Sequence, residues 1–210
     1  MSSSLHKVDS TSPGDGVEGN ARLTATNAMV LLALLAVEGF TIISVRRFIT
    51  LHIFLGILLI GPVLLKTGST LYRFARYYSG APSYLAKGPP HPVLRILGPL
   101  VIASSLSLLG TGLALLTAKP GSAGLLLTAH KASFIIWVAV MTIHVLGHLK
   151  DAFLISWREI REGANSEAAP RRTLRITLIA LALILGAATA TAIMPAAASW
   201  TTGTTDHHDR

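Results

Sequence analysis

The sequence predicts an all-α membrane protein, a bundle of five transmembrane helices. Hydrophobic residues make up 51% of the 210 residues, and charged residues make up only 13%. The apolar residues are gathered into five long runs, which the core of a soluble protein would not need. Basic residues cluster where those runs end, as they do beside the spans of membrane proteins.

Each run is long enough to cross a hydrocarbon layer, which takes about 20 helical residues. The runs cover about 24–45, 48–72, 93–117, 121–155 and 174–194. The first run lacks a small-residue cleavage pattern and is followed by Arg46 and Arg47, so we expect a retained helix. Pro195 is placed to end the fifth. The transmembrane domain then covers 23–197, between a polar tail at 1–22 that we expect to be disordered and a flexible tail at 198–210.

The Lys and Arg residues predict the orientation. Five spans place the termini on opposite sides, which we call side A (N-terminal) and side B. Side A has twelve basic residues, Lys7, Arg22, Arg73, Arg76, Lys87, Arg95, Lys150, Arg158, Arg161, Arg171, Arg172 and Arg175, and side B has five, Arg46, Arg47, Lys119, Lys131 and Arg210. Lys66 lies within a run. We therefore expect an integral protein of the inner (cytoplasmic) membrane, with its N-terminus in the cytoplasm and its C-terminus outside.

Composition also limits the function. The net charge of +8 does not indicate nucleic-acid binding, because the basic residues lie where they contact the lipid bilayer and its anionic headgroups. Without Cys, the chain has no disulfide, iron–sulfur cluster or Cys-ligated zinc. It also lacks a Walker motif, a dinucleotide fingerprint and an HExxH motif. Redox chemistry would need a bound cofactor.

Histidines inside the runs are the candidate ligands. His130 and His144 are fourteen residues apart, which on a helix is about 21 Å and about 40° short of four full turns, so both rings leave nearly the same face. His148 lies one turn beyond His144. His52 lies about one turn inside side B, at a depth similar to that of His130. Because neutral imidazole is a common axial ligand of haem iron, we expect His52 and His130 to bind a b-type haem between helices two and four.

A second haem toward side A is a further expectation. His144 or His148 would supply one ligand, and His91, in the Pro-rich lead into the third run, would supply the other. Fourteen residues after His52, however, the second run has Lys66, an unusual haem ligand whose ammonium can instead extend toward the side-A headgroups.

Small and cationic residues accompany these histidines. The second and third runs contain small residues that would admit a flat porphyrin: Gly56, Gly61, Ser104, Ser105, Ser107, Gly110, Thr111 and Gly112. Helix packing in lipid uses the same residue types. Haem propionates prefer cationic partners, which Arg46 and Arg47 offer near side B and Arg73 and Arg76 near side A. Topology alone explains these arginines equally well.

Glu38 is the only acidic residue well inside a run, in the side-B half of the first. It is a candidate to exchange protons with a quinone or to hydrogen-bond a ligating histidine. A structural ion pair with Lys131, Arg46 or Arg47 explains it equally well.

The segments RRFITLH and AHKASFIIWVAVMTIHVLGH, within about 46–155, resemble the transmembrane b-type cytochromes. That family includes membrane subunits that link quinone to hydrogenases, formate dehydrogenases or periplasmic molybdenum enzymes. His52, His130 and His144 match its ligand positions, whereas Lys66 does not. The resemblance implies an electron-transfer subunit with haem b, a wire of haems, a quinone site beside one of them, and a redox enzyme subunit as partner.

Two other functions fit the same residues. One is a non-haem structural or accessory subunit, in which the histidines hold helices together. The other is a small proton-coupled transporter that uses Glu38, Lys66 and the histidines. Transporters often have inverted repeats and broken helices, and the sequence shows neither. An absorption spectrum separates the haem protein from both.

Overall fold

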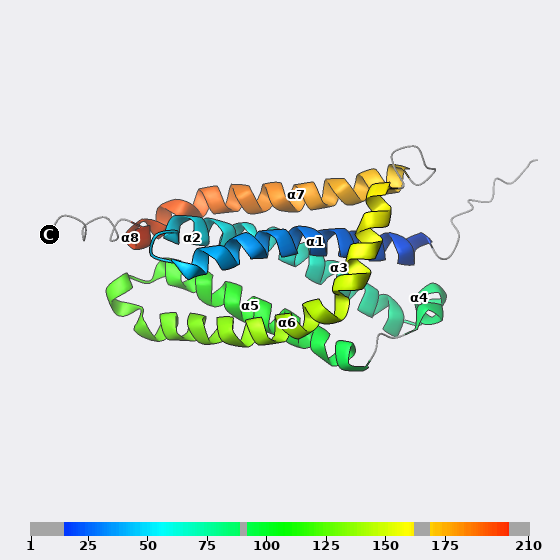
Figure 1. Cartoon of the computed structure of the whole chain (residues 1–210), viewed down its shortest axis with the longest axis horizontal. Coiled ribbons are helices and arrows are strands. Elements are labelled where there is room, and N and C mark those ends of the chain that lie inside the picture. The colour runs from blue at the N-terminus through cyan, green and yellow to red at the C-terminus, as the bar shows by residue number, and fades with distance from the viewer. Residues whose placement is uncertain (1–14, 89–91, 162–168, 202–210) are drawn as a thin grey trace, which may run out of the picture.

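The computed structural model describes residues 15–88, 92–161 and 169–201, which are helical except for short turns. Five helical spans long and apolar enough to cross a membrane lie side by side (Figure 1). The predicted all-α architecture with five spans is therefore confirmed. The orientation in the membrane stays a prediction.

The successive spans alternate in direction between the two ends of the bundle (Figure 1). The α-helices are α1 (Asp15–Ile43), α2 (Ile49–Leu58), α3 (Ile60–Tyr78), α4 (Pro82–Lys87), α5 (Pro92–Thr117), α6 (Gly124–Arg161), α7 (Ala169–Ile193) and α8 (Ala198–Thr201). Two 3-10 turns, η1 (Pro120–Ser122) and η2 (Met194–Ala197), follow α5 and α7. α2 and α3 together form the second span.

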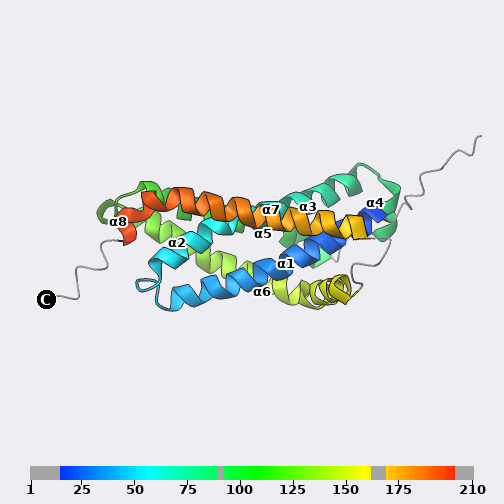
Figure 2. The same cartoon turned by 90° about the horizontal axis from the view of Figure 1, so that it is seen from above.

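Four spans make a closed core, and the fifth lies outside it. α5 packs along α6, α6 along α1, α1 along α2 and α3, and α2 against α5. α7 covers the outside of α2 and α3, as both cartoon views show (Figures 1 and 2). Near side B, α2 and α6 each pack against both α1 and α5. α2 and α6 therefore lie diagonally opposite each other across the core.

The sequence analysis treated the second run as one continuous helix. In the structure, this helix breaks after Leu58. Pro62 has no N–H to donate to the Leu58 carbonyl, which weakens the helix at this point. α7 packs against the break: a Cβ added to Gly186 would collide with the Leu58 carbonyl, and one added to Gly61 would collide with the Ala182 carbonyl. The two glycines allow the backbones to approach closely, as small residues do in lipid.

Residues 15–22 and 198–201, which the sequence analysis assigned to the two tails, are helical. Residues 15–22 belong to α1, where Asn20 Nδ2 donates to the Ser69 carbonyl at 3.2 Å and Val17 packs with Ala81 and Tyr84; residues 1–14 lie outside the described residues. Burial, with a smaller contribution from Tyr72, raises the pKa of the Tyr84 phenol and keeps it neutral in this cluster.

At the other end of the chain, residues 198–201 form α8. Trp200 Nε1 lies 3.0 Å from the Leu115 carbonyl oxygen and 3.2 Å from that of Ala118. Carbonyls at the C-terminal end of a helix have no partner within it, so the indole of Trp200 ties α8 to the end of α5. Residues 202–210 lie outside the described residues.

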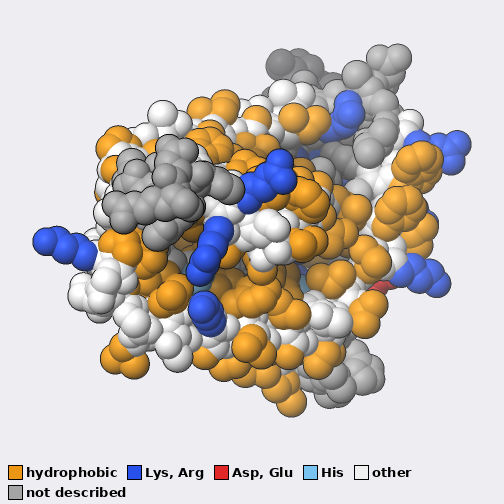
Figure 3. Space-filling view, turned by 60° about the vertical axis from the view of Figure 1, so that its left-hand side comes forward, with side chains coloured by type: hydrophobic (Ala, Val, Ile, Leu, Met, Phe, Trp, Pro, Cys, Tyr) orange, Lys and Arg blue, Asp and Glu red, His pale blue; other side chains and the backbone are white. Residues whose placement is uncertain are grey.

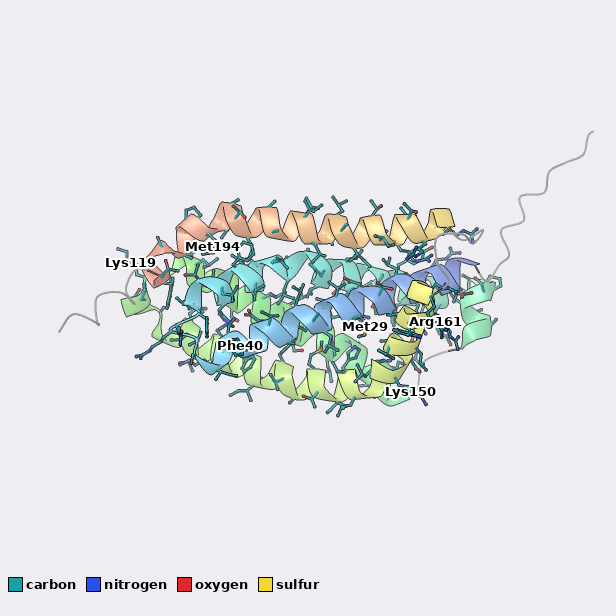
Figure 4. All side chains as sticks on the ribbon, turned by 45° about the horizontal axis from the view of Figure 1, so that its top comes forward. Met29, Phe40, Lys119, Lys150, Arg161 and Met194 are labelled. Carbon is teal, nitrogen blue, oxygen red and sulfur yellow. The ribbon has the colours of Figure 1, made fainter. Side chains whose placement is uncertain are left out.

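α6 continues past the predicted end of the fourth run and ends at Arg161. Its last part, drawn in yellow and running from near Lys150 to Arg161, turns across the side-A end of the bundle (Figures 1 and 4). Phe153 and Trp157 stack there with ring centroids 6.1 Å apart, and both are about half exposed. Aromatic residues of this kind are typical of the membrane–water interface.

Candidate functional site

His52, on the first turn of α2, turns its ring toward α1. Its Nδ1 lies 2.7 Å from Glu38 Oε1 and 3.0 Å from Thr41 Oγ1. The Thr41 hydroxyl donates to the Glu38 carbonyl at 2.6 Å, so its oxygen is left to accept a hydrogen bond. Nδ1 of a neutral His52 is therefore the protonated nitrogen, and Nε2 keeps the lone pair that can bind a metal.

His130, on α6, has the same arrangement with α5. Its Nδ1 lies 3.0 Å from Thr111 Oγ1. The Thr111 hydroxyl lies within donating distance of two carbonyls, Ser107 at 2.8 Å and Leu108 at 3.0 Å, so its oxygen accepts from the ring. Ser133 Oγ, 3.2 Å from Thr111 Oγ1, donates to the His130 carbonyl at 2.9 Å. Nε2 is again the nitrogen with the available lone pair.

The two rings lie in the same part of the core. They extend from the diagonal helices α2 and α6 and lie close enough for their charges to interact. Gly112 of α5 lies under the His130 ring, since a Cβ added there would be 3.2 Å from His130 Cε1. The structure thus brings the predicted pair to one level of the bundle, each ring held through Nδ1 by a neighbouring helix.

Glu38 belongs to this site. Its side chain is 13% exposed and that of His52 is 21% exposed. Of the explanations open at the sequence level, the structure shows the contact with a candidate histidine. Among the described residues Glu38 makes no ion pair with Lys131, Arg46 or Arg47. Its second oxygen, Oε2, is buried without a hydrogen-bond partner, so one acceptor remains unused.

At side A, His144 and His148 lie on one face of α6, with ring centroids 4.8 Å apart and planes at 57°. Axial ligands approach haem iron from opposite sides of the porphyrin, which neighbouring rings of one helix at this distance cannot do. If a haem were bound at side A, these two histidines could therefore fill only one of its two ligand positions. His91, the predicted partner ligand, lies outside the described residues.

The predicted propionate partners lie near the ends of the bundle. Arg47 is exposed at the turn between α1 and α2, with its guanidinium 5.7 Å from the centre of the Phe48 ring. The view toward side B shows Lys and Arg side chains among hydrophobic ones (Figure 3). Arg73 is exposed on α3 and lies close enough to His148 for their charges to interact. A role of either arginine toward propionates stays a prediction.

Two imidazoles are the donors that this site offers to a metal. The described parts of the chain contain no cluster of three or more His, Cys, Asp or Glu side chains that could hold a bare metal ion. Haem iron takes four ligands from the porphyrin and needs only two axial ligands from the protein. His52 and His130 offer two imidazoles whose Nδ1 atoms are engaged by neighbouring helices, so two Nε2 donors are available.

No family model matches the chain, and no curated protein or solved structure is significantly similar to it. The likeness to b-type cytochromes therefore remains an interpretation of the histidine pattern, and the function has to be inferred from the site.

One part of the site was missed at the sequence level. Thr41, which is fully buried, was not singled out although it contacts His52 directly. It follows Glu38 by three residues, so both side chains lie on one face of α1. That spacing was the available signal, because a polar pair on one face of a transmembrane helix usually has a polar partner.

Proposed function

We propose that the protein is a membrane electron-transfer subunit that holds a b-type haem between α2 and α6, with Nε2 of His52 and Nε2 of His130 as axial ligands. The observation that supports this proposal is the shared arrangement of the two rings. Each is fixed through Nδ1 by a side chain of the neighbouring helix, which is how ligating histidines are commonly oriented.

The surrounding residues would set the properties of this site. A bound haem supplies one-electron oxidation and reduction. With a haem bound, the negative charge of the Glu38 carboxylate, 2.7 Å from His52 Nδ1, would favour the oxidised iron. Thr111 gives His130 a neutral partner, so the two ligands differ in strength. The unused Oε2 of Glu38 can accept a proton if a quinol is oxidised nearby.

The redox partners are part of the same proposal. The site lies near side B, so electrons would exchange there with a redox enzyme subunit, and the quinone pool would supply or receive them. The geometry supports a haem held by His52 and His130. A second haem would require His91, which lies outside the described residues.

Substitution of the ligands tests the proposal. His52→Ala and His130→Ala should each abolish most of the haem that co-purifies with the chain. Leu51→Ala and Lys131→Ala, one residue away on the same helices, are the matched controls and should retain it. In His52→Gly, added imidazole should restore haem binding, because it replaces the missing ligand. Full haem retention in both alanine variants would refute the assignment.

Two observations favour a second candidate, the proton-coupled transporter. The second span is broken after Leu58, and the Glu38–His52 contact joins two groups that can exchange a proton. A haem-free protein that carries protons into vesicles, and loses this activity in Glu38→Gln, would favour this function. A haem-free protein without such flux would indicate the structural or accessory subunit.

A further inference from the structure

The side chain of Lys66 carries an ammonium group inside the second span, where it has one hydrogen-bond acceptor. Its Nζ donates to the carbonyl oxygen of Thr24, on α1, at 2.9 Å. An ammonium has three N–H donors, so two are unused. In the described part of the chain no carboxylate forms an ion pair with Lys66. A cation in this environment without a counter-ion is costly, and such a residue usually has a ligand or a functional partner.

Three more basic side chains lie on the same side of the bundle, two of them close to Lys66. His144 and His148, on α6, lie near enough to Lys66 for their charges to interact, and Arg73, on α3, is equally near to His148. We call Lys66, Arg73, His144 and His148 the basic cluster. Nδ1 of His144 is buried without a hydrogen-bond partner. The acidic neighbour is Asp151, which is exposed on the next turn of α6 beside His148.

The basic cluster extends from the edge of the hydrocarbon toward the side-A headgroups. Thr24 begins the first apolar run, so the Lys66 ammonium that contacts its carbonyl lies at that edge. Arg73, seven residues further along α3, is about 10 Å nearer to side A. α3 and α6 both pack against α1 and supply the cluster from its two sides. The phosphate layer of the side-A leaflet is therefore within reach of these donors.

We propose that the basic cluster binds the phosphate of an anionic phospholipid of the side-A leaflet, between α3 and α6. Phosphate oxygens would accept hydrogen bonds from the unused N–H groups of Lys66 and from the guanidinium of Arg73, and the negative charge would offset both cations. Basic sites between transmembrane helices on the cytoplasmic side commonly recognise anionic headgroups. This inference does not depend on haem binding.

Native mass spectrometry of the full-length protein tests it. After delipidation in detergent, the protein receives equal amounts of phosphatidylglycerol and phosphatidylcholine. Wild type should retain phosphatidylglycerol preferentially. Lys66→Met keeps the length of the side chain without its charge and should bind phosphatidylglycerol at least about tenfold more weakly, the loss expected for a hydrogen bond to a charged group. Arg73→Gln should be weakened similarly. Lys119→Gln, which removes an exposed cation at side B, is the matched control and should bind as wild type does.

Helical circular dichroism and a single size-exclusion peak establish that each variant is folded. If Lys66→Met does not fold, Arg73→Gln and His148→Gln decide the question. Equal retention of the two lipids by wild type, or unchanged selectivity in the folded variants, would overturn the proposal. Displacement of the lipid by millimolar inorganic phosphate would identify a soluble anion as the ligand instead. A loss of haem in His144→Ala would assign the cluster to a second haem.

Discussion

Gly112→Leu should displace the His130 ring and prevent it from binding iron. A Cβ at position 112 would lie 3.2 Å from His130 Cε1, already closer than the roughly 3.5–4.0 Å at which carbon atoms pack best. The branched end of a leucine extends further toward the ring. His130 would then have to move by an amount on the order of 1 Å, whereas metal–ligand distances tolerate only about 0.2 Å.

Gly110→Leu is the matched control. It changes the same residue type on the same helix, but nothing lies within 4 Å of a Cβ added at Gly110. Both substitutions replace a helical glycine, which favours the helix by about 1 kcal/mol, so a difference between the variants reports contact with the ring. The assay is the Soret absorbance per chain of protein purified from haem-supplied cells.

We expect Gly110→Leu to retain the haem content of wild type and Gly112→Leu to lose most of it, while both remain helical and monodisperse. Equal haem content in the two variants would refute the inference that His130, in the position the structure gives it, is an axial ligand. Gly112→Ala should have an intermediate effect, because a methyl group requires the ring to move only slightly.

The remaining predictions concern Glu38, the packing of α7 and the orientation. Glu38→Gln should keep the haem, because the amide oxygen still accepts a hydrogen bond from His52 Nδ1. It should raise the midpoint potential of the haem, because the negative charge is lost. An unchanged potential in a redox titration would contradict this role. Gly186→Leu should lower thermal stability, by on the order of 1–3 kcal/mol or more, because its side chain would collide with the Leu58 carbonyl, whereas Gly98→Leu, with open space at its Cβ, should not. Reporter fusions after Gly80 and after Arg161 should both indicate the cytoplasm, and a periplasmic signal from either would overturn the orientation.

Much of the fold could be predicted because the length of an apolar run determines whether a helix can span the membrane. The break in the second span could not, because Pro62 barely lowers the hydropathy of its run and transmembrane helices tolerate proline. The helical residues 15–22 were missed because their order comes from tertiary contacts, such as that of Asn20 with Ser69, and not from their own composition.

The candidate site was predictable in part for a similar reason. The depth of His52 and His130 follows from residue counting, and the structure brings the two rings to one level. Which face of α1 contacts α2 depends on how the helices pack. The sequence could therefore identify Glu38 as an unusual acidic residue, but it could not predict the contact of Glu38 with His52. The hydroxyls of Thr41 and Thr111 contact the rings only because four helices meet there, which no spacing within a single run reveals.

The most direct test of the proposed function is the reduced-minus-oxidised absorption spectrum of the purified wild-type protein. We predict a Soret band and a reducible α-band of b-type haem, with about one haem per chain bound through His52 and His130. Purified, folded protein from haem-supplied cells that shows neither band would contradict the assignment and leave Glu38, His52 and His130 as a polar site without haem.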